Sequence, residues 1–427
     1  LIIISEIPNV KAIFAGRYAH NANLIDSRIY YLGGIDERDK LLDDFFFLDV
    51  SGGTNFNDYS FQNFPVDRAN PGISWGATIT TQHSIIYLYG GLKANNEVWQ
   101  LANNSYSIDV KNSPLWTEKE IPLETGPAGR RSMTSIIDKA GIMYVFGGSN
   151  QTINGVTRGN YDRTMYKFDT ATGLWSQAPL RTSGIDSTTL PGFDYSATLL
   201  DDGKNIYIGG QLANGVYLDM NKIWSYNTIN DQWTLNRAGG ISVTARASHS
   251  AVLANDRTSI IIYGGWGEPN PITDDQALII LDTTTWTWSK PSITNPSLTR
   301  HAHTATLYKN YMIVAFGAHQ DKFDSQIISS NFISILDISK FKWVTSIDNN
   351  QTNSLPNNQT SNPPSSSSDN SGSRLAIIIG ASAAGFVGFT ILIIAGVLLY
   401  RHLDQKKMNE RAEAGMSEVV VVQPNII

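Results

Sequence analysis

Three histidines in one sequence pattern are the side chains best suited to chemistry. Each follows an arginine at a fixed spacing, in Arg17-x-x-His20, Arg246-x-x-His249 and Arg300-x-x-His303. Neutral imidazole is a common ligand of zinc, copper and iron, so histidines at equivalent places of a repeat could hold a metal together. The corresponding places elsewhere hold other residue types: Gly76, Met133 and Tyr195. We therefore expect these arginines and histidines to hydrogen-bond neighbouring parts of the fold, as buried polar groups usually do.

The sequence offers little other catalytic chemistry. It contains no cysteine, which excludes disulfides, thiolate metal sites and cysteine nucleophiles. It has no Ser-His-Asp arrangement, phosphate-binding glycine loop or His-Glu-x-x-His motif. Adjacent carboxylates at Asp43-Asp44, Asp201-Asp202 and Asp274-Asp275 lie in expected turns, where solvated loop charge is the favoured interpretation. No catalytic, cofactor-binding or metal-binding residue is predicted.

An internal repeat must position these residues. Six times, a β-branched or aromatic run ends in a glycine pair or in Gly-Ala, and the first glycines lie 53 to 62 residues apart. The glycines that mark the repeats are Gly33, Gly34, Gly90, Gly91, Gly147, Gly148, Gly209, Gly210, Gly264, Gly265 and Gly317. A large aromatic follows these glycines in each of the six repeats, at Phe61, Trp116, Trp175, Trp233, Trp288 and Trp343. Between the two markers an Asp or Asn ends a strand, for which Ala102 and Asp109 are both candidates in the second repeat.

Each marker suits a structural role. Two glycines at the end of a strand permit positive φ angles and close approach of neighbouring backbones. An Asp or Asn favours a tight turn into the next strand. The large aromatic fills the space between adjacent sheets. Four short strands in each repeat predict the blades of a β-propeller rather than a helical solenoid.

With these markers, residues 16–345 resemble the kelch-repeat family, in its galactose-oxidase-like and attractin-like propellers. The resemblance implies an all-β, six-bladed propeller over residues 16–347. Its blades would span about 16–64, 73–119, 130–178, 193–236, 246–291 and 300–345. A copper oxidase of the galactose-oxidase type is disfavoured, because that cofactor needs a tyrosine cross-linked to a cysteine. Residues 1–15 have two interpretations: the remainder of a signal peptide, or a strand at Val10 to Ala15 that pairs with the sixth blade.

Residues 375–400 have the character of a transmembrane helix. They contain no charged residue and would extend about 39 Å as a helix, against about 30 Å for a bilayer core. Basic residues are more frequent after this segment than before it, which places the tail 401–427 in the cytosol and the propeller outside. The Ser-, Asn- and Pro-rich segment 348–373 predicts a disordered stalk. We expect a single-pass type I membrane protein of the plasma membrane or secretory pathway.

Two short patterns bear on this expected topology. Asn-x-Ser/Thr sequons, which are candidate N-glycosylation sites, occur at Asn103, Asn150, Asn350 and Asn358. Small residues also recur every four positions along the expected transmembrane helix, at Ala376, Gly380, Ala384 and Gly388. We favour an ordinary lipid-facing helix here, and the alternative is a homodimer formed through this segment.

The function favoured by the sequence is a binding module. The net charge of −6 and the lack of Lys/Arg clusters in residues 1–345 argue against nucleic acid as a partner. Loops on one face of the ring would recognise an extracellular protein or glycan, with Tyr161 and Trp266 as aromatic candidates; the alternative for both is packing within their loops. A second hypothesis is a sugar-modifying enzyme of the epimerase or mutarotase type, with its site at the propeller channel. A third is a purely structural surface protein.

Overall fold

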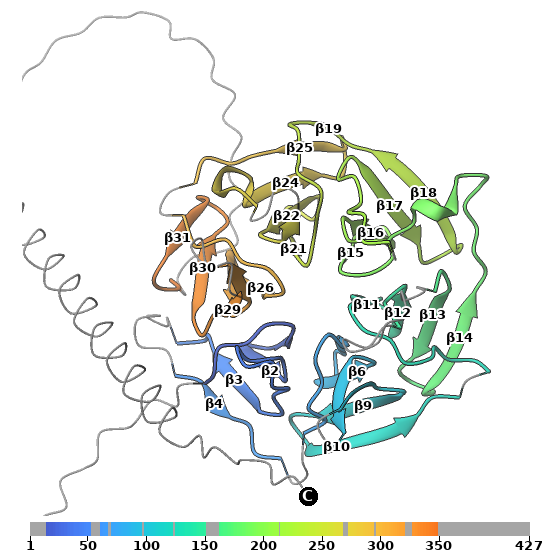
Figure 1. The fold of residues 1–427 in the computed structure, drawn as a ribbon, viewed down its shortest axis with the longest axis vertical. Coiled ribbons are helices and arrows are strands. Elements are labelled where there is room, and N and C mark those ends of the chain that lie inside the picture. The colour runs from blue at the N-terminus through green and yellow to red at the C-terminus, as the bar shows by residue number, and fades with distance from the viewer. Residues whose placement is uncertain are drawn as a thin grey trace, which may run out of the picture. The chain divides into compact units, whose positions relative to one another are not determined.

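The computed structural model describes the chain between residues 14 and 348. The described ranges are 14–52, 60–66, 70–95, 98–122, 124–150, 162–212, 214–267, 272–293, 296–320 and 327–348. They all belong to the first of two units into which the chain divides, residues 1–358 and 359–427. Figure 1 shows six antiparallel sheets arranged as blades around a central axis. The predicted six-bladed, all-β propeller is confirmed.

Each blade contains four antiparallel strands in chain order. Blade 1 has β1 (Asn21–Ile25), β2 (Arg28–Leu32), β3 (Phe45–Asp49) and β4 (Gln62–Asn63). Blade 2 has β5 (Ala77–Thr80), β6 (Ile85–Tyr89), β9 (Asn104–Asp109) and β10 (Ser113–Glu120). Blade 3 has β11 (Ser135–Ile137), β12 (Ile142–Phe146), β13 (Met165–Asp169) and β14 (Leu174–Ala178).

The remaining three blades repeat this order. Blade 4 has β15 (Ser196–Leu199), β16 (Lys204–Ile208), β17 (Lys222–Asn227) and β18 (Gln232–Arg237). Blade 5 has β21 (Ser250–Leu253), β22 (Ser259–Tyr263), β24 (Leu278–Asp282) and β25 (Thr287–Ser289), and β19 (Gly239–Gly240) pairs with β25 in parallel. Blade 6 has β26 (Thr304–Tyr308), β27 (Tyr311–Ala315), β30 (Ile333–Asp337) and β31 (Lys342–Val344). The first strands of successive blades contact one another in a closed cycle, so they line the central axis.

Short ladders extend the loops that follow the glycine pairs. They are β7 (Leu92–Asn95) with β8 (Val98–Leu101), β20 (Arg246–Ala247) with β23 (Trp266–Gly267), and β28 (Ala318–Gln320) with β29 (Ile327–Ser329). The β7–β8 hairpin resolves the ambiguous second repeat. Asp109 ends the third strand of blade 2, and Ala102 directly follows the inserted hairpin.

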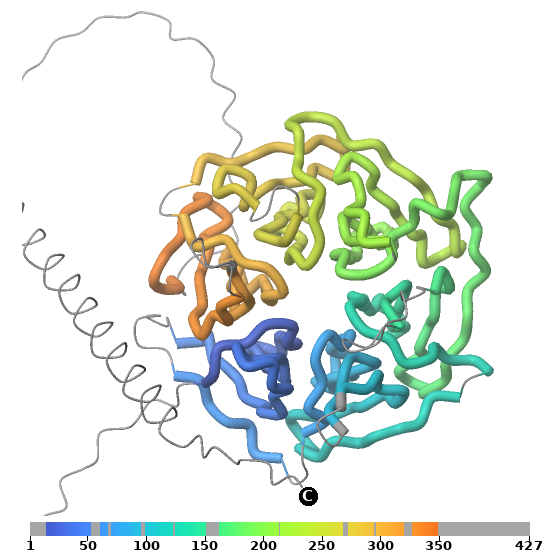
Figure 2. The backbone as a smooth tube through the Cα atoms, viewed as in Figure 1, coloured from blue at the N-terminus to red at the C-terminus, as the bar shows by residue number. Residues whose placement is uncertain are grey.

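The ring closes between blades 6 and 1 through backbone hydrogen bonds. The Gly317 N–H donates to the Arg17 carbonyl at 2.8 Å, and the Arg17 N–H donates to the Ser330 carbonyl at 3.1 Å. Blade 6 takes its fourth strand from its own repeat. The suggested closing strand at Val10 to Ala15 falls mostly outside the described residues, and its last two residues belong to no strand. The path of the tube in Figure 2 shows blades 1 and 6 side by side.

The glycine pairs allow neighbouring blades to approach closely. Both members of a pair have positive φ, as in Gly264 at 67° and Gly265 at 107°. A Cβ atom at Gly264 would lie 2.1 Å from the Arg300 carbonyl oxygen of blade 6, and the Gly265 N–H donates to that same oxygen at 3.0 Å. The glycine therefore serves both backbone conformation and blade contact.

The sixth repeat keeps this geometry in a shifted register. Gly317 was expected to match the first glycine of the other pairs. Instead, Phe316 has that conformation, with φ of 55°, and Gly317 makes the bond that the second glycine makes elsewhere. The register predicted for the sixth repeat was wrong by one residue, because Phe316 has the left-handed backbone conformation that a glycine has in the other repeats.

We predict that Gly264→Ala will destabilise the propeller by about 1–3 kcal/mol, because the added Cβ meets a backbone oxygen and the left-handed φ disfavours alanine. Gly239→Ala is the matched control, since Gly239 has open space around its Cβ position and no positive φ. The measurement is the free energy of unfolding in denaturant. Equal effects of the two substitutions would contradict this account of the glycine pairs.

The large aromatics fill the spaces between blades, as expected. Trp175 of blade 3 lies 5.3 Å from Tyr89 of blade 2, and Trp343 of blade 6 lies 5.0 Å from Tyr263 of blade 5, measured between ring centroids. The Trp288 indole of blade 5 donates to a blade 4 carbonyl at 2.9 Å. These side chains are buried in hydrophobic clusters that each join adjacent blades.

Candidate functional site at the channel mouth

The three patterned histidines connect adjacent blades. His20 Nε2 lies 2.8 Å from the Thr304 hydroxyl of blade 6, and His249 Nε2 lies 2.9 Å from the Ser196 hydroxyl of blade 4. His303 Nε2 lies 2.7 Å from the Ser250 hydroxyl of blade 5. Burial lowers the pKa of all three imidazoles, with that of His249 at about 3. The predicted contact of these histidines with neighbouring blades is confirmed.

The patterned arginines act differently, because their side chains bind their own blade. Arg246 Nη1 donates to the Gly264 carbonyl at 3.0 Å and to the Gln276 carbonyl at 2.8 Å. Arg17 Nη2 pairs with Asp44 at 2.7 Å, so the carboxylate of Asp44 is not the solvated loop charge expected of it. The backbone carbonyls of Arg246 and Arg17 reach a neighbouring blade, where they accept glycine N–H groups. Burial lowers the pKa of Arg246 to about 10.

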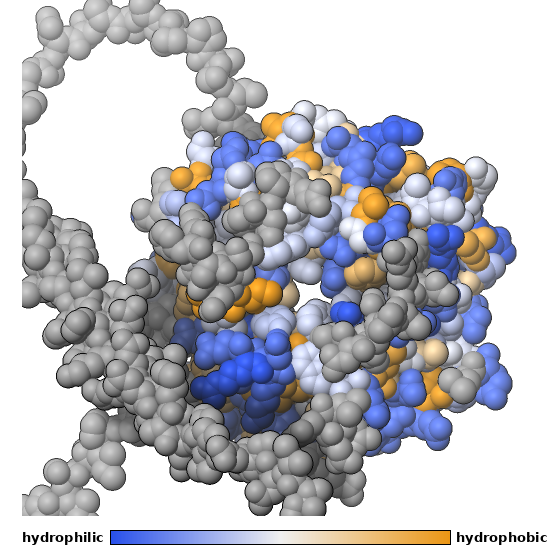
Figure 3. All heavy atoms as spheres, in the orientation of Figure 1, coloured by the Kyte–Doolittle hydropathy of each residue, from blue (hydrophilic) through white to orange (hydrophobic). Residues whose placement is uncertain are grey.

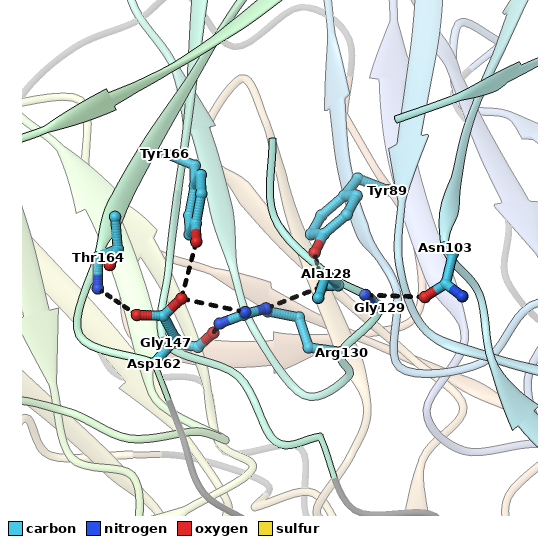
Figure 4. Close-up of polar contacts among 9 residues, drawn as sticks. All are labelled: Tyr89, Asn103, Ala128, Gly129, Arg130, Gly147, Asp162, Thr164 and Tyr166. Carbon is cyan, nitrogen blue, oxygen red and sulfur yellow. Dashed lines mark hydrogen bonds and ion pairs between the residues drawn. The ribbon is translucent and has the colours of Figure 1, made fainter. Parts of the chain in front are cut away.

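Blade 3 has a fourth buried arginine, Arg130. The Arg-x-x-His pattern does not include it, because Met133 takes the place of the histidine. Arg130 Nη1 donates to the Gly147 carbonyl at 2.9 Å, its Nε donates to the Ala128 carbonyl at 3.1 Å, and its Nη2 lies 3.2 Å from Asp162 (Figure 4). The Tyr166 hydroxyl donates to the same Asp162 carboxylate at 2.8 Å. The sequence signal was present, since Arg130 has the same spacing to Met133 as the other arginines have to histidine.

Two of the four candidate glycosylation sites lie among the described residues. Asn103 is exposed, and its Oδ1 accepts the Gly129 N–H at 2.9 Å (Figure 4). Asn150 is exposed next to β12. Asn350 and Asn358 lie outside the described part of the chain.

A ring of six residues, one from each blade, surrounds one end of the channel. We call it the mouth ring: Ala19, Trp75, Ser132, Asp194, Ser248 and Ala302. All six have left-handed backbones, with φ between 48° and 62°. Each N–H donates to the carbonyl of the ring residue in the preceding blade at 2.8–2.9 Å, so the hydrogen bonds form a closed circle. Strained backbones of this kind persist only where surrounding structure fixes them, and they cluster at functional sites.

The mouth ring borders an open cavity of about 140 Å³. His20, His249 and His303 line the same cavity, together with Met133, Thr134 and Tyr195. Burial raises the pKa of Asp194, while the charge of Arg131 and the Ser132 and Ser248 hydroxyls partly offset this effect. Arg131 has its guanidinium 5.2 Å from the centroid of the Trp75 ring. A half-buried carboxylate, hydroxyls and an aromatic ring therefore converge on one cavity.

Two aromatic contacts form the rim of the mouth. Tyr18 lies 5.9 Å from Trp75 and donates its hydroxyl to Asp39 at 3.1 Å. Trp266, a predicted ligand-face residue, contacts His301 of blade 6, with 4.6 Å between the ring centroids. Burial lowers the pKa of His301 to about 4. The second predicted aromatic, Tyr161, lies outside the described residues. Figure 3 shows the central hollow with both hydrophilic and hydrophobic side chains around it.

Comparisons with known proteins agree with this geometry. The model of the Attractin/LZTR1 beta-propeller family matches residues 86–388, which is well over half of the chain. The chain belongs to this family. Putative protein tag-53 of Caenorhabditis elegans is 25% identical over 288 residues, which are 65% of this chain and 20% of that protein. Acyl-CoA-binding domain-containing protein 4 of Arabidopsis thaliana is 21% identical over 287 residues, which are 65% of this chain and 40% of that protein.

The chain thus spans less than half the length of each of these two relatives. Among solved structures, that of YjhT is similar, with a TM-score of 0.57 and 14% sequence identity. The alignment covers 77% of this chain and 97% of that one, and at this identity it shows the fold alone. Membership in the Attractin/LZTR1 beta-propeller family supports an interaction module built on a propeller.

The propeller has a second opening, at the end of its channel opposite the mouth ring. A cleft of about 650 Å³ lies among the turns that join the first and second strands of blades 2 to 5. Asp201 lines this cleft and pairs with Arg257 at 2.7 Å, and Asp202 pairs with Lys204 at 2.6 Å. Both carboxylates form ion pairs that are exposed to solvent, which agrees with their predicted place in a turn.

Sequence reasoning missed the residues that make the mouth distinctive. Trp75, Arg131 and Asp194 occupy places where the repeats differ from one another, so no recurring pattern marked them. Within the described ranges, no group of three or more His, Cys, Asp or Glu side chains could hold a metal ion. Within those same ranges, no helix is long and apolar enough to cross a membrane; the expected span 375–400, the stalk beyond Asp348 and the tail lie outside them.

Proposed function

We propose that this chain is a membrane-anchored interaction module that presents its channel-mouth face to an extracellular protein or glycan. One observation carries the proposal: the mouth ring opens to solvent on the same face as Trp266 and the loops that follow the glycine pairs. Loops held by a rigid scaffold are the usual place for recognition. A few convergent polar groups in a concave site supply specificity.

Membrane anchoring rests on the apolar segment 375–400 and the basic residues after it. The test is surface biotinylation of cells that express the full chain, together with treatment by an N-glycosidase. We expect the propeller to be labelled on intact cells and to lose mass on deglycosylation. Labelling only after cell lysis would contradict the proposed orientation.

The recognition face is tested by a partner screen with the full chain, using proximity labelling on cells and a glycan array. We predict that Trp266→Ala will weaken binding of the identified partner about tenfold or more, because a large aromatic at an interface is often an energetic hot spot. Trp286→Ala is the matched control, since Trp286 lies in the turn between β24 and β25 of the same blade. Equal loss for both variants, or for neither, would contradict the assigned face.

A second candidate is a sugar-modifying enzyme at the same mouth. Asp194 favours it, because a half-buried carboxyl with a raised pKa in a cavity is a typical acid or base. NMR exchange spectroscopy on free monosaccharides with the purified chain measures anomer interconversion directly. Interconversion at the uncatalysed rate would leave the interaction module as the function.

A further inference from the structure

The channel-mouth cavity offers mainly hydrogen-bond acceptors. The Nδ1 atoms of His20, His249 and His303 are buried without a hydrogen-bond partner, and all three residues line the cavity. When Nε2 donates to the Ser or Thr hydroxyl, Nδ1 of a neutral imidazole is an acceptor. Low pKa values keep these imidazoles neutral at pH 7. In that tautomer, a ligand group that reaches these Nδ1 atoms would be a hydrogen-bond donor.

The acceptors are joined by negative charge. Asp194 is half-buried in the mouth ring, and the small side chains of Ala19 and Ala302 complete the ring in blades 1 and 6. Burial raises the pKa of Asp194, and the charge of Arg131 partly offsets this effect in favour of the ionised carboxylate. At the rim, Asp36 and Asp39 are close enough to Tyr18 to raise the pKa of its hydroxyl, after burial as the main cause. Asp194 is thus the carboxylate of the mouth cavity itself, and the rim loop adds Asp36 and Asp39 beside the basic residues Arg38 and Lys40.

Aromatic rings complete the site. Trp75 belongs to the mouth ring, and Tyr18 meets it edge to face with centroids 5.9 Å apart. A cation within about 6 Å of an aromatic face gains about 0.5–2 kcal/mol, and more when it is desolvated. The Arg131 guanidinium already makes such a cation–π contact with the Trp75 ring. Figure 3 shows strongly hydrophilic surface over blade 1 where it borders the hollow.

We propose that the channel mouth binds an exposed basic side chain, lysine or arginine, of a protein partner. The inference rests on the proposed interaction function and names the chemistry of its partner. An ammonium group has three donors and no acceptor, which matches a site of carboxylate and imidazole acceptors. A sugar hydroxyl both donates and accepts, so its acceptor lone pairs would find few donors in a site of this kind. The cavity of about 140 Å³ holds a side-chain head group rather than a folded loop.

The test uses the full chain and three small probes. These are acetyl-Gly-Lys-Gly-amide, acetyl-Gly-Gln-Gly-amide and methyl β-galactoside, with binding measured by tryptophan fluorescence and by NMR of the probe. We expect the lysine peptide to bind at least tenfold more tightly than the other two probes. We also expect its affinity to fall as salt rises, since charges that are not fully buried are screened. Tighter binding of the galactoside or of the glutamine peptide would overturn the inference.

Asp194→Asn provides the decisive variant, and Asp26→Asn its matched control. Both aspartates have left-handed backbones, with φ of 55° and 54°, and the substitution removes the same charge at each. Asp26 lies in the turn between β1 and β2, and it is not among the residues of the mouth cavity. We expect Asp194→Asn to weaken the lysine peptide at least tenfold and Asp26→Asn to have no effect. Unchanged binding by Asp194→Asn would contradict the proposal even if the peptide binds the unaltered chain.

This outcome can be separated from failure of the proposed function. A partner found by proximity labelling that binds Asp194→Asn as well as the unaltered chain would sustain the interaction module and overturn the basic-side-chain site. A lysine peptide that binds through Asp194, with no partner found on cells, would sustain the site and count against the interaction function.

Discussion

Acidification from pH 7 to pH 5 should lower the free energy of unfolding by at least about 6 kcal/mol, because three buried histidines resist protonation in the folded state. An unfolded histidine with a pKa of about 6.5 binds a proton across this range, whereas the folded imidazoles have pKa values well below it. The unfolded state therefore binds more protons, and stability falls as pH falls. Each histidine contributes about 2 kcal/mol at pH 5.

This expected loss is large compared with the total stability of a typical domain, which is about 5–15 kcal/mol. It is also separable from the titration of carboxylates whose pKa is lowered. Asp231 and Asp282 have pKa values below the ordinary 3.8, so the stability they contribute is lost only at more acidic pH. Asp194, whose pKa burial raises, acts in the opposite direction, because the folded state binds its proton more tightly. His301, with its pKa lowered to about 4, adds to the loss in the same window as the other histidines.

The measurement is denaturant unfolding at pH 7, 6 and 5 for the unaltered chain and for His249→Gln. The glutamine amide can still donate to the Ser196 hydroxyl but does not titrate, so the pH dependence should shrink by about 2 kcal/mol over this range. His83→Gln, at an exposed histidine, is the matched control and should leave the pH dependence as it was. A stability that stays flat from pH 7 to 5 would contradict neutral, buried histidines between the blades.

The architecture was predictable because recurring residues report recurring geometry. Gly264 is a glycine because the next blade's backbone stands too close for a side chain, and Gly265 is a glycine because Ala247 and His249 of its own blade crowd it. Trp343 is large because a fixed space between two sheets must be filled. The same structural requirements recur in each blade, so the residues that meet them recur at regular intervals in the sequence. The exception, Phe316 in the place of a glycine, shifted the expected register by one residue.

The candidate site could not be found in the same way. Asp194 and Trp75 stand at one equivalent place of the ring, but they differ from each other and from Ala19 and Ser248, because each blade contributes a different function to a shared cavity. Only closure of the ring brings these residues together across the chain. The histidines were noticed because they recur, and their recurrence reflects contact between blades rather than ligand chemistry.

Loss of the buried Arg130 guanidinium should cost about 3–5 kcal/mol of stability, the range expected when one partner of a buried ion pair is removed. Arg130→Met has similar length but removes a donor from the Gly147 carbonyl, the Ala128 carbonyl and the Asp162 carboxylate. The Ala128 carbonyl keeps the Tyr89 hydroxyl as a donor, and the carboxylate keeps its bonds from Thr164 and Tyr166 but loses its positive partner. Burial would raise the pKa of Asp162, but hydrogen bonds from Thr164 and Tyr166 and the charge of Arg130 lower it overall. Without the arginine, that carboxylate would remain charged and half-buried.

Arg257→Met is the matched control, because Arg257 makes an exposed pair with Asp201 and exposed pairs contribute about 0–1 kcal/mol. The double variant Arg130→Met with Asp162→Leu sharpens the test. Replacing both members of a buried pair removes the unpaired charge, so it should recover part of the loss caused by Arg130→Met alone. Denaturant unfolding measures all three variants. If Arg130→Met costs no more than Arg257→Met, then the arginines beneath the glycine pairs do not stabilise the blades as their contacts indicate, and the backbone ladder and packing suffice to hold the second strand to the third.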